Sequence, residues 1–120
     1  MKAIVLFAHG SRDLLWSKPI EAIAQATSKL SPNAIVRCAY LELMEPSLGL
    51  VVEDLKQQGV AHISVTPMFL GVGKHAREDL PQLIDTLRTA HPTLTLELLP
   101  SIGEHPALID TVTKILTKSL

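Results

Sequence analysis

Apolar runs alternate along this chain with segments of helical spacing. The first run, Ala3 to Ala8, is apolar throughout and ends abruptly at His9-Gly10. Continuous runs of this kind are typical of strands that are covered on both faces, as in parallel sheets. Further strands are predicted over residues 34–41, 62–70 and 93–99. Because Pro67 cannot donate to a strand ladder, it predicts the end of the third strand or a locally unpaired position.

Helices are predicted after each strand, because apolar residues recur there at intervals of three and four. Ser47 is a candidate N-cap for the second helix, and Gly59 stands where a C-terminal cap is expected. Leu80, Leu83, Ile84 and Leu87 mark the third helix. Pro106 suits the first turn of a last helix, which carries Leu108, Ile109, Val112, Ile115 and Leu116.

Four alternations of strand and helix with short connections imply a parallel sheet with right-handed crossovers. We therefore expect an α/β fold of three layers, a four-stranded parallel sheet flanked by helices, in a doubly wound, flavodoxin-like arrangement. A chain of 120 residues is expected to form one domain over residues 1–120.

Composition narrows the classes of function. The formal net charge is −1, which argues against a general nucleic-acid binder with a basic face. The single cysteine, Cys38, excludes an internal disulfide and fits a reducing cytoplasm. No segment approaches the roughly 20 apolar residues of a membrane span, so no membrane partner is expected. We interpret residues 1–8 as a buried strand and not as a signal peptide.

Chemically active side chains stand just past the predicted strands. His9 follows the first strand, Glu42 the second, His75 the third and Glu104-His105 the fourth. In a parallel sheet these positions fall at the carboxyl edge, where ligand clefts form. Two imidazoles and a carboxylate there could bind a divalent metal ion or move protons. The alternatives are that His9 caps the next helix or bonds a loop carbonyl, and that Glu42 is a solvated strand-end acid.

The segment Leu70-Gly71-Val72-Gly73-Lys74-His75 joins the third strand to the third helix. Its two glycines let a ligand come close to the backbone. The segment lacks the third glycine of a dinucleotide fingerprint, and the chain has no phosphate loop. Because His9 and Glu42 are expected at the same edge of the sheet, a phosphate is the poorer candidate ligand for this segment.

Four motifs occur in a fixed order over nearly the whole chain. They are His9-Gly10-Ser11-Arg12, Leu41-Glu42-Leu43-Met44-Glu45-Pro46-Ser47, Pro67 to His75 followed by Asp79-Leu80-Pro81, and Ile102-Gly103-Glu104-His105-Pro106. Together they resemble the CbiX/SirB type chelatases. The resemblance implies the class II chelatase fold and insertion of a divalent ion, cobalt above all, into sirohydrochlorin, on the route to cobalamin or sirohaem. It implies no nucleotide and no cofactor beyond the substrate metal.

The resemblance also implies roles for individual residues. His9 and His75 would hold the metal, with His9 also accepting a pyrrole proton, and Glu42 or Glu45 would assist. Residues Leu70, Gly71, Val72, Gly73, Lys74 and His75 would line the tetrapyrrole. The short length resembles the homodimeric members, in which the cleft is built between two subunits.

The peripheral carboxylates of such a substrate call for cations at the cleft rim, which Arg12, Lys74 and Arg77 could supply. Each of these, like Glu45 at a helix entry, could equally be a solvated surface residue. Three other hypotheses stay open: a nickel or ferrous chelatase on the same macrocycle, a non-catalytic carrier of metal or tetrapyrrole, and a structural α/β module.

Overall fold

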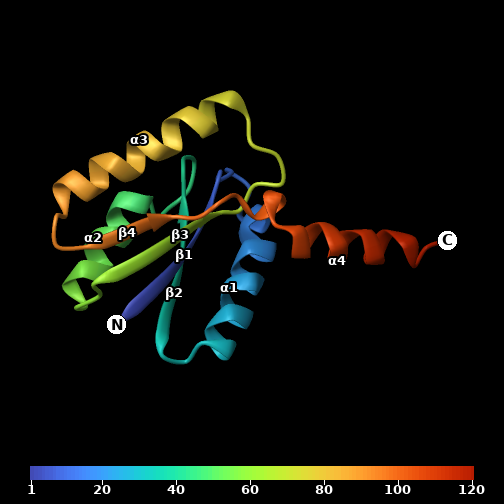
Figure 1. Ribbon diagram of the computed structural model, residues 1–120, viewed down its shortest axis with the longest axis horizontal. Helices are drawn as coiled ribbons and strands as arrows, with labels where there is room; N and C mark the ends of the chain where they lie inside the picture. Colours follow the sequence, from blue (N-terminus) through green and yellow to red (C-terminus); the bar gives the residue numbers. More distant parts are fainter.

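The computed structural model describes residues 1–120 and is built on a four-stranded parallel sheet (Figure 1). The strands are β1 (Lys2–Ala8), β2 (Ala34–Tyr40), β3 (His62–Pro67) and β4 (Thr95–Leu98), in the spatial order β2-β1-β3-β4. The chain moves to one side of β1 first and to the other side afterwards. The topological switch point therefore lies between β1 and β3, where open α/β sheets bind ligands.

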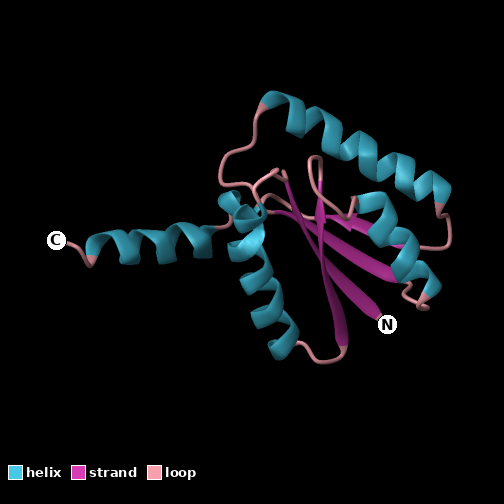
Figure 2. Ribbon diagram, turned by 180° about the vertical axis from the view of Figure 1, so that it is seen from behind, coloured by secondary structure: helices cyan, strands magenta, loops and turns pink.

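Helices cover the two faces of the sheet unequally (Figures 1 and 2). Helix α1 (Lys18–Leu30) lies on one face, and α2 (Leu48–Gln57) and α3 (Lys74–Ala90) lie on the other. Helix α4 (Pro106–Thr117) extends away from the sheet. Short 3-10 turns, η1 (Leu14–Ser17) and η2 (Ile102–Glu104), precede α1 and α4. The predicted α/β architecture with a four-stranded parallel sheet is confirmed, and no helix is long and apolar enough to cross a bilayer.

The hydrophobic core lies between the sheet and the pair α2 and α3. Alternate residues of β1 point into it, and Val5 and Phe7 are completely buried. The helices contribute Val51, Val52 and Leu55 from α2 and Leu80, Ile84 and Leu87 from α3. This core fixes α3, and with it the side chains near the start of α3, over the carboxyl edge of the sheet.

The ends of the elements agree with most of the sequence signals. The Ser47 hydroxyl accepts a hydrogen bond from the Leu50 N–H at 3.2 Å, so the predicted N-cap is confirmed. Gly59 follows α2 with φ +86°, the conformation expected of a C-terminal glycine. Strand β3 ends at Pro67 and not at Leu70, and α3 begins at Lys74. The predicted strand was three residues too long because Pro67 stops the ladder.

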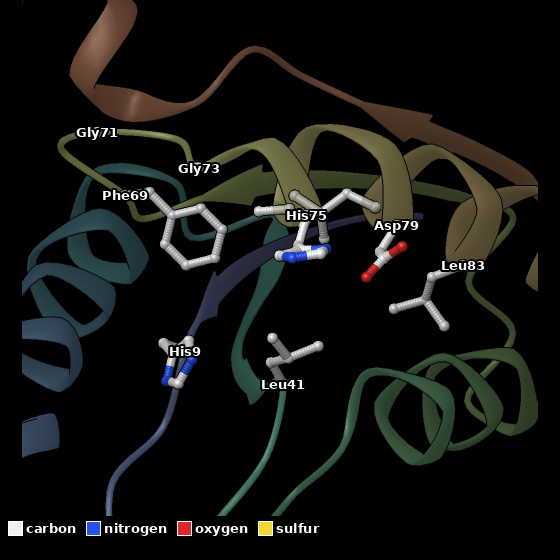
Figure 3. A pocket seen from close by; sticks show the side chains of 10 residues that line it. His9, Leu41, Phe69, Gly71, Gly73, His75, Asp79 and Leu83 are labelled. Atoms are coloured by element: carbon white, nitrogen blue, oxygen red, sulfur yellow. The ribbon is translucent and has the colours of Figure 1, made fainter.

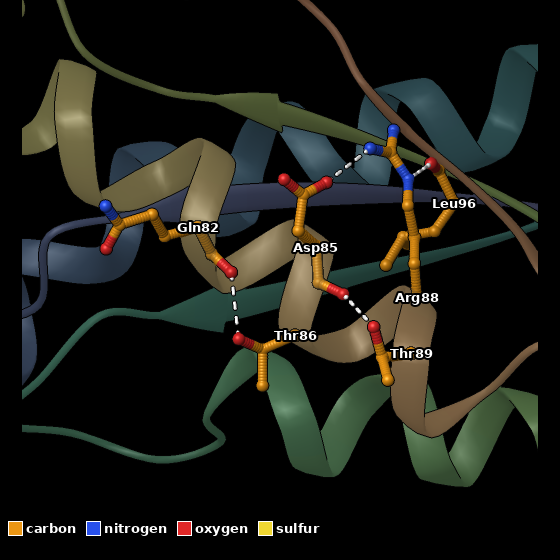
Figure 4. Close-up of polar contacts among 6 residues, drawn as sticks. All are labelled: Gln82, Asp85, Thr86, Arg88, Thr89 and Leu96. Atoms are coloured by element: carbon orange, nitrogen blue, oxygen red, sulfur yellow. Dashed lines mark hydrogen bonds and ion pairs between the residues drawn. The ribbon is translucent and has the colours of Figure 1, made fainter.

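Polar contacts tie the second half of α3 to the edge strand β4 (Figure 4). The Arg88 Nε donates to the carbonyl of Leu96 at 2.9 Å, and its Nη1 donates to Asp85 at 2.9 Å. The hydroxyls of Thr86 and Thr89 donate to the carbonyls of Gln82 and Asp85 within α3. The guanidinium thus joins helix and sheet outside the apolar core.

The only cysteine lies on β2 beneath α1. Burial raises the pKa of the Cys38 thiol above its ordinary 9.0, and the Glu21 carboxylate raises it further. Burial likewise raises the pKa of the Tyr40 phenol above its ordinary 10.0. Cys38 is therefore a protonated packing residue at neutral pH and a poor nucleophile.

A raised folded-state pKa makes a pH-dependent contribution to stability. The contribution of Cys38 is complete below the thiol's unfolded-state pKa and is lost as the pH rises through the higher folded-state value. We expect the thermal midpoint of the wild type to fall more steeply than that of Cys38→Ala as the pH rises above the thiol's ordinary pKa of 9.0. Calorimetry at half-unit pH steps measures this difference, and parallel curves for the two proteins would contradict it.

Candidate functional site

A cavity of about 500 Å³ opens at the carboxyl edge of the sheet (Figure 3). Its walls come from the ends of β1 and β2, the β3–α3 connection and the first three turns of α3. Apolar side chains make up half of the lining. The complete lining consists of His9, Leu41, Phe69, Gly71, Gly73, His75, Ala76, Asp79, Leu80 and Leu83.

His9 lines the cavity and pairs with Glu42, which is not itself part of the lining. The His9 Nε2 lies 3.3 Å from the Glu42 Oε1, and both side chains are about half exposed, at 54% and 55%. The other ring nitrogen, Nδ1, lies 3.2 Å from the Gly10 carbonyl oxygen. Both nitrogens therefore face an acceptor. An imidazolium, which carries an N–H at each nitrogen, can donate to both, so this surrounding suits a histidine that accepts a proton.

The backbone around Gly10 sets the spacing of this pair. The Glu42 N–H donates to the His9 carbonyl at 3.1 Å, which joins the two loops directly. Gly10 has φ +97°, and a Cβ at this position would lie 1.9 Å from the Glu42 carbonyl oxygen. Only glycine therefore allows the approach.

His75 faces the same cavity from α3 (Figure 3). It was expected just past the third strand, and it lies eight residues beyond β3, in the first turn of the helix that begins after Gly73. The structure therefore places His9 and His75 on one cavity, as the sequence predicted. No three side chains of His, Cys, Asp or Glu cluster closely enough within the chain to hold a metal ion.

The remaining predicted residues divide into two groups. Gly71 and Gly73 line the cavity. Arg12, Glu45, Leu70 and Lys74 are exposed, and neither they nor the half-buried Val72 belong to the lining. Any role for this second group stays a prediction.

Comparison with known proteins gives the same assignment as the motifs. The family model of CbiX matches residues 3–119. The crystal structure of a CbiX protein from Marinobacter aquaeolei VT8 superposes with a TM-score of 0.87 at 37% identity, covering 99% of this chain and 97% of that chain. The chain belongs to the CbiX family.

Relatives of this CbiX-family chain carry two related names. A sirohydrochlorin cobaltochelatase of Methanopyrus kandleri is 33% identical over 84 residues, which cover 70% of this chain and 59% of the relative. A sirohydrochlorin ferrochelatase of Bacillus subtilis is 28% identical over 102 residues, which cover 85% of this chain and 39% of the relative. The chain therefore spans about three fifths or less of the length of these relatives.

Sequence reasoning missed part of the cavity of this CbiX-family chain. Leu41, Phe69 and Leu83 form apolar wall, and Asp79 points its carboxylate toward the cavity (Figure 3). Asp79 follows His75 by four residues, which puts both on one face of a helix. That spacing is visible in the sequence, but it becomes informative only once α3 is known to begin before His75.

Proposed function

We propose that this CbiX-family chain is a sirohydrochlorin chelatase that inserts a divalent metal ion, with Co²⁺ as the leading substrate ion. The observation that carries the proposal is the pair of histidines, His9 and His75, on opposite walls of one apolar cavity. The chelatase names of the relatives support it, because the family match covers residues 3–119. No resident cofactor is required.

The chemistry requires proton acceptors as well as metal ligands. Insertion forms bonds between the ion and the ring nitrogens and releases two pyrrole N–H protons. In our proposal His9, assisted by Glu42 at 3.3 Å, takes one of these protons as a general base. His75 presents the ion, because neutral imidazole is a good ligand for cobalt, nickel and iron. Asp79, one turn farther along α3, is a second carboxylate available to the departing protons.

The separation of His9 and His75 on different walls suits a site that must release its metal ion. Closed structural sites hold a metal with four protein ligands. Here His9 and His75 stand on different walls, and no cluster of three ligands is preformed. An ion held by few protein ligands keeps open positions, which the macrocycle nitrogens can take over.

Gly71 and Gly73 support a flat substrate. No protein atom lies within 4 Å of a Cβ built at either position, so packing within the chain does not require glycine there. We propose that the macrocycle lies against this stretch, with Leu70 and Val72 beside it. Arg12, Lys74 and Arg77 are proposed to meet the peripheral carboxylates. Glu45 stays an alternative to Glu42 as the assisting acid.

We place this activity in the cytoplasm and in a homodimer whose second copy completes the cleft. The half-exposed side chains of His9 and Glu42 support the homodimer, because insertion into a macrocycle benefits from a site closed to water and a second copy could cover them. The single half-buried cysteine supports the cytoplasmic location, because free thiols persist in a reducing compartment.

Absorbance spectroscopy of sirohydrochlorin mixed with Co²⁺ and catalytic protein tests the proposal. We expect multiple turnovers and a rate well above the spontaneous one. Stoichiometric binding without turnover would indicate a carrier, and neither binding nor turnover would indicate a structural module; both results would overturn the proposal. Parallel assays with Ni²⁺ and Fe²⁺ identify the preferred ion, since one relative is named a ferrochelatase.

A further inference from the structure

Phe69 is the one aromatic hydrocarbon side chain at the cavity. The chain has two phenylalanines, one tyrosine and one tryptophan. Phe7 is completely buried in the core, and Trp16 and Tyr40 form an edge-to-face pair with ring centroids 6.4 Å apart. None of these three lines the cavity, whereas Phe69 does. Figure 3 shows the Phe69 ring projecting toward the cavity from the connection that leads to α3. Phe69 is therefore the only apolar ring that the cavity offers to a ligand.

The backbone at Phe69 is fixed although it lies two residues past β3, outside regular secondary structure. The Met68 N–H donates to the Phe7 carbonyl at 2.7 Å, which continues the contact with β1. The Phe69 carbonyl accepts two hydrogen bonds from the loop after β4. The donors are the Ser101 hydroxyl at 2.6 Å and the Gly103 N–H at 3.0 Å. The position from which the ring projects is therefore set by two neighbouring segments of the sheet edge.

Ser101 is a buried polar residue that has no place in the cavity wall. Only 6% of its surface is exposed, and it does not line the cavity. Its hydroxyl also lies 3.5 Å from the Pro67 carbonyl, but its distance to the Phe69 carbonyl is much shorter. The Gly103 N–H alone already gives the Phe69 carbonyl the partner that a backbone acceptor needs. The serine is therefore not required to satisfy that carbonyl, and its effect is to fix the carbonyl's direction.

We propose that the Phe69 ring packs against the face of the macrocycle, and that Ser101 is a positioning residue that holds the ring there. The inference rests on the proposed function, because it takes a flat conjugated tetrapyrrole as the substrate. Aromatic rings attract flat π systems in offset stacks, with a gain beyond that of apolar burial alone. Part of the Phe69 side chain packs against the hydrophobic core, and the exposed remainder is free for the ligand.

The stacked contact is present before and after metal insertion, because exchange of two pyrrole protons for an ion leaves the macrocycle conjugated. An interaction that is equally strong in the bound substrate and in the transition state lowers KM without raising kcat. Phe69 is therefore expected to set the affinity for the macrocycle, whereas His9 and His75 set the rate of insertion.

Fluorescence titration of metal-free sirohydrochlorin into the full chain measures the stack without an insertion step. Phe69→Leu keeps an apolar side chain but removes the ring, and we expect it to raise both Kd and KM by roughly 2–10-fold with kcat unchanged. Phe69→Tyr is the matched control, because it keeps the ring, and it should bind nearly as tightly as the wild type. Circular dichroism establishes that both variants are folded.

A double-mutant cycle tests whether Ser101 acts through that ring. Ser101→Ala should raise the Kd for the macrocycle, but by less than Phe69→Leu does, because Gly103 still holds the carbonyl. In a Phe69→Leu background the same substitution should have little further effect, since the ring that it positions is absent. An increase in Kd by the same factor in both backgrounds would overturn the positioning role.

The titration separates this inference from the proposed function. Wild-type affinity in Phe69→Leu, or an equal loss in Phe69→Tyr, would overturn the stacked contact and leave the chelatase assay unaffected. Binding by the wild type that depends on the Phe69 ring, but without turnover, would support the contact and overturn the chelatase activity alone. A wild type that does not bind sirohydrochlorin would overturn both.

Discussion

Replacing His9 with alanine should slow insertion of Co²⁺ into sirohydrochlorin by roughly 10²–10⁴-fold, the range that a positioned general base contributes. His9 is expected to accept a pyrrole proton, and its Nε2 lies 3.3 Å from the Glu42 carboxylate. Glu42→Gln should therefore cause a smaller loss, because the imidazole remains but the charge that stabilises its protonated form is gone. His75→Ala should cause a loss of similar size to His9→Ala, with weaker cobalt binding as an additional effect.

A second histidine–carboxylate pair in the same sheet provides the control. The His62 Nε2 lies 3.4 Å from Glu97. His62 is the first residue of β3, at the end of that strand opposite the cavity, and Glu97 lies two residues into β4. His62→Ala should retain the wild-type insertion rate. Initial rates at matched oligomeric state, with cobalt affinity from titration calorimetry, separate the roles of the two cavity histidines. Wild-type rates in both His9→Ala and His75→Ala would refute the site assignment.

Gly103→Ala should strongly destabilise the fold. A Cβ at position 103 would lie 1.9 Å from the Leu70 carbonyl oxygen and 2.7 Å from the Leu70 Cα. The obstacle is backbone, and the Gly103 N–H also donates to the Phe69 carbonyl at 3.0 Å, so neither segment can move freely. Overpacking typically costs 1–3 kcal/mol. We expect about 3 kcal/mol, which lowers the thermal midpoint by about 10 °C in a domain of this size.

Gly71→Ala is the matched control for this substitution. Gly71 lies in the β3–α3 connection, next to Leu70, but no atom lies within 4 Å of its Cβ position, and it does not have a positive φ. Its thermal midpoint should stay close to that of the wild type. Scanning calorimetry measures both variants, and equal midpoints for Gly103→Ala and wild type would show that the two loops are not packed as described.

Gly103 links the loop after β4 to the loop that borders the cavity. Residues 102–104 form η2 and press against Phe69 and Leu70, the residues that lead into the cavity loop. Neither Gly103 nor Leu70 lines the cavity. The loop after β4 therefore packs against the start of the Leu70–His75 segment, which we propose lines the tetrapyrrole. A substitution there is expected to alter both stability and substrate affinity.

The sequence by itself determined the order of elements and the edge of the sheet at which the chemistry gathers. Apolar runs, the Ser47 cap and the interruptions at Gly59 and Pro67 are local signals, because strand burial, capping and ladder hydrogen bonding depend on neighbouring residues. A parallel sheet then brings the residues after its strands to one edge, so that His9, Glu42 and His75 could be grouped without coordinates.

Only the tertiary structure decided which of these groups share a surface. Helix α3 begins at Lys74, so His75 and Asp79 lie on one helical face that is directed toward the cavity. The packing of α3 on β1 and β3, which are distant in sequence, sets that direction. The apolar pattern of α4 correctly predicted a helix, but periodicity shows only that a face is apolar and not what covers it. In the tertiary structure α4 leaves the body of the domain after η2 and none of its residues is buried, a direction that local spacing does not encode.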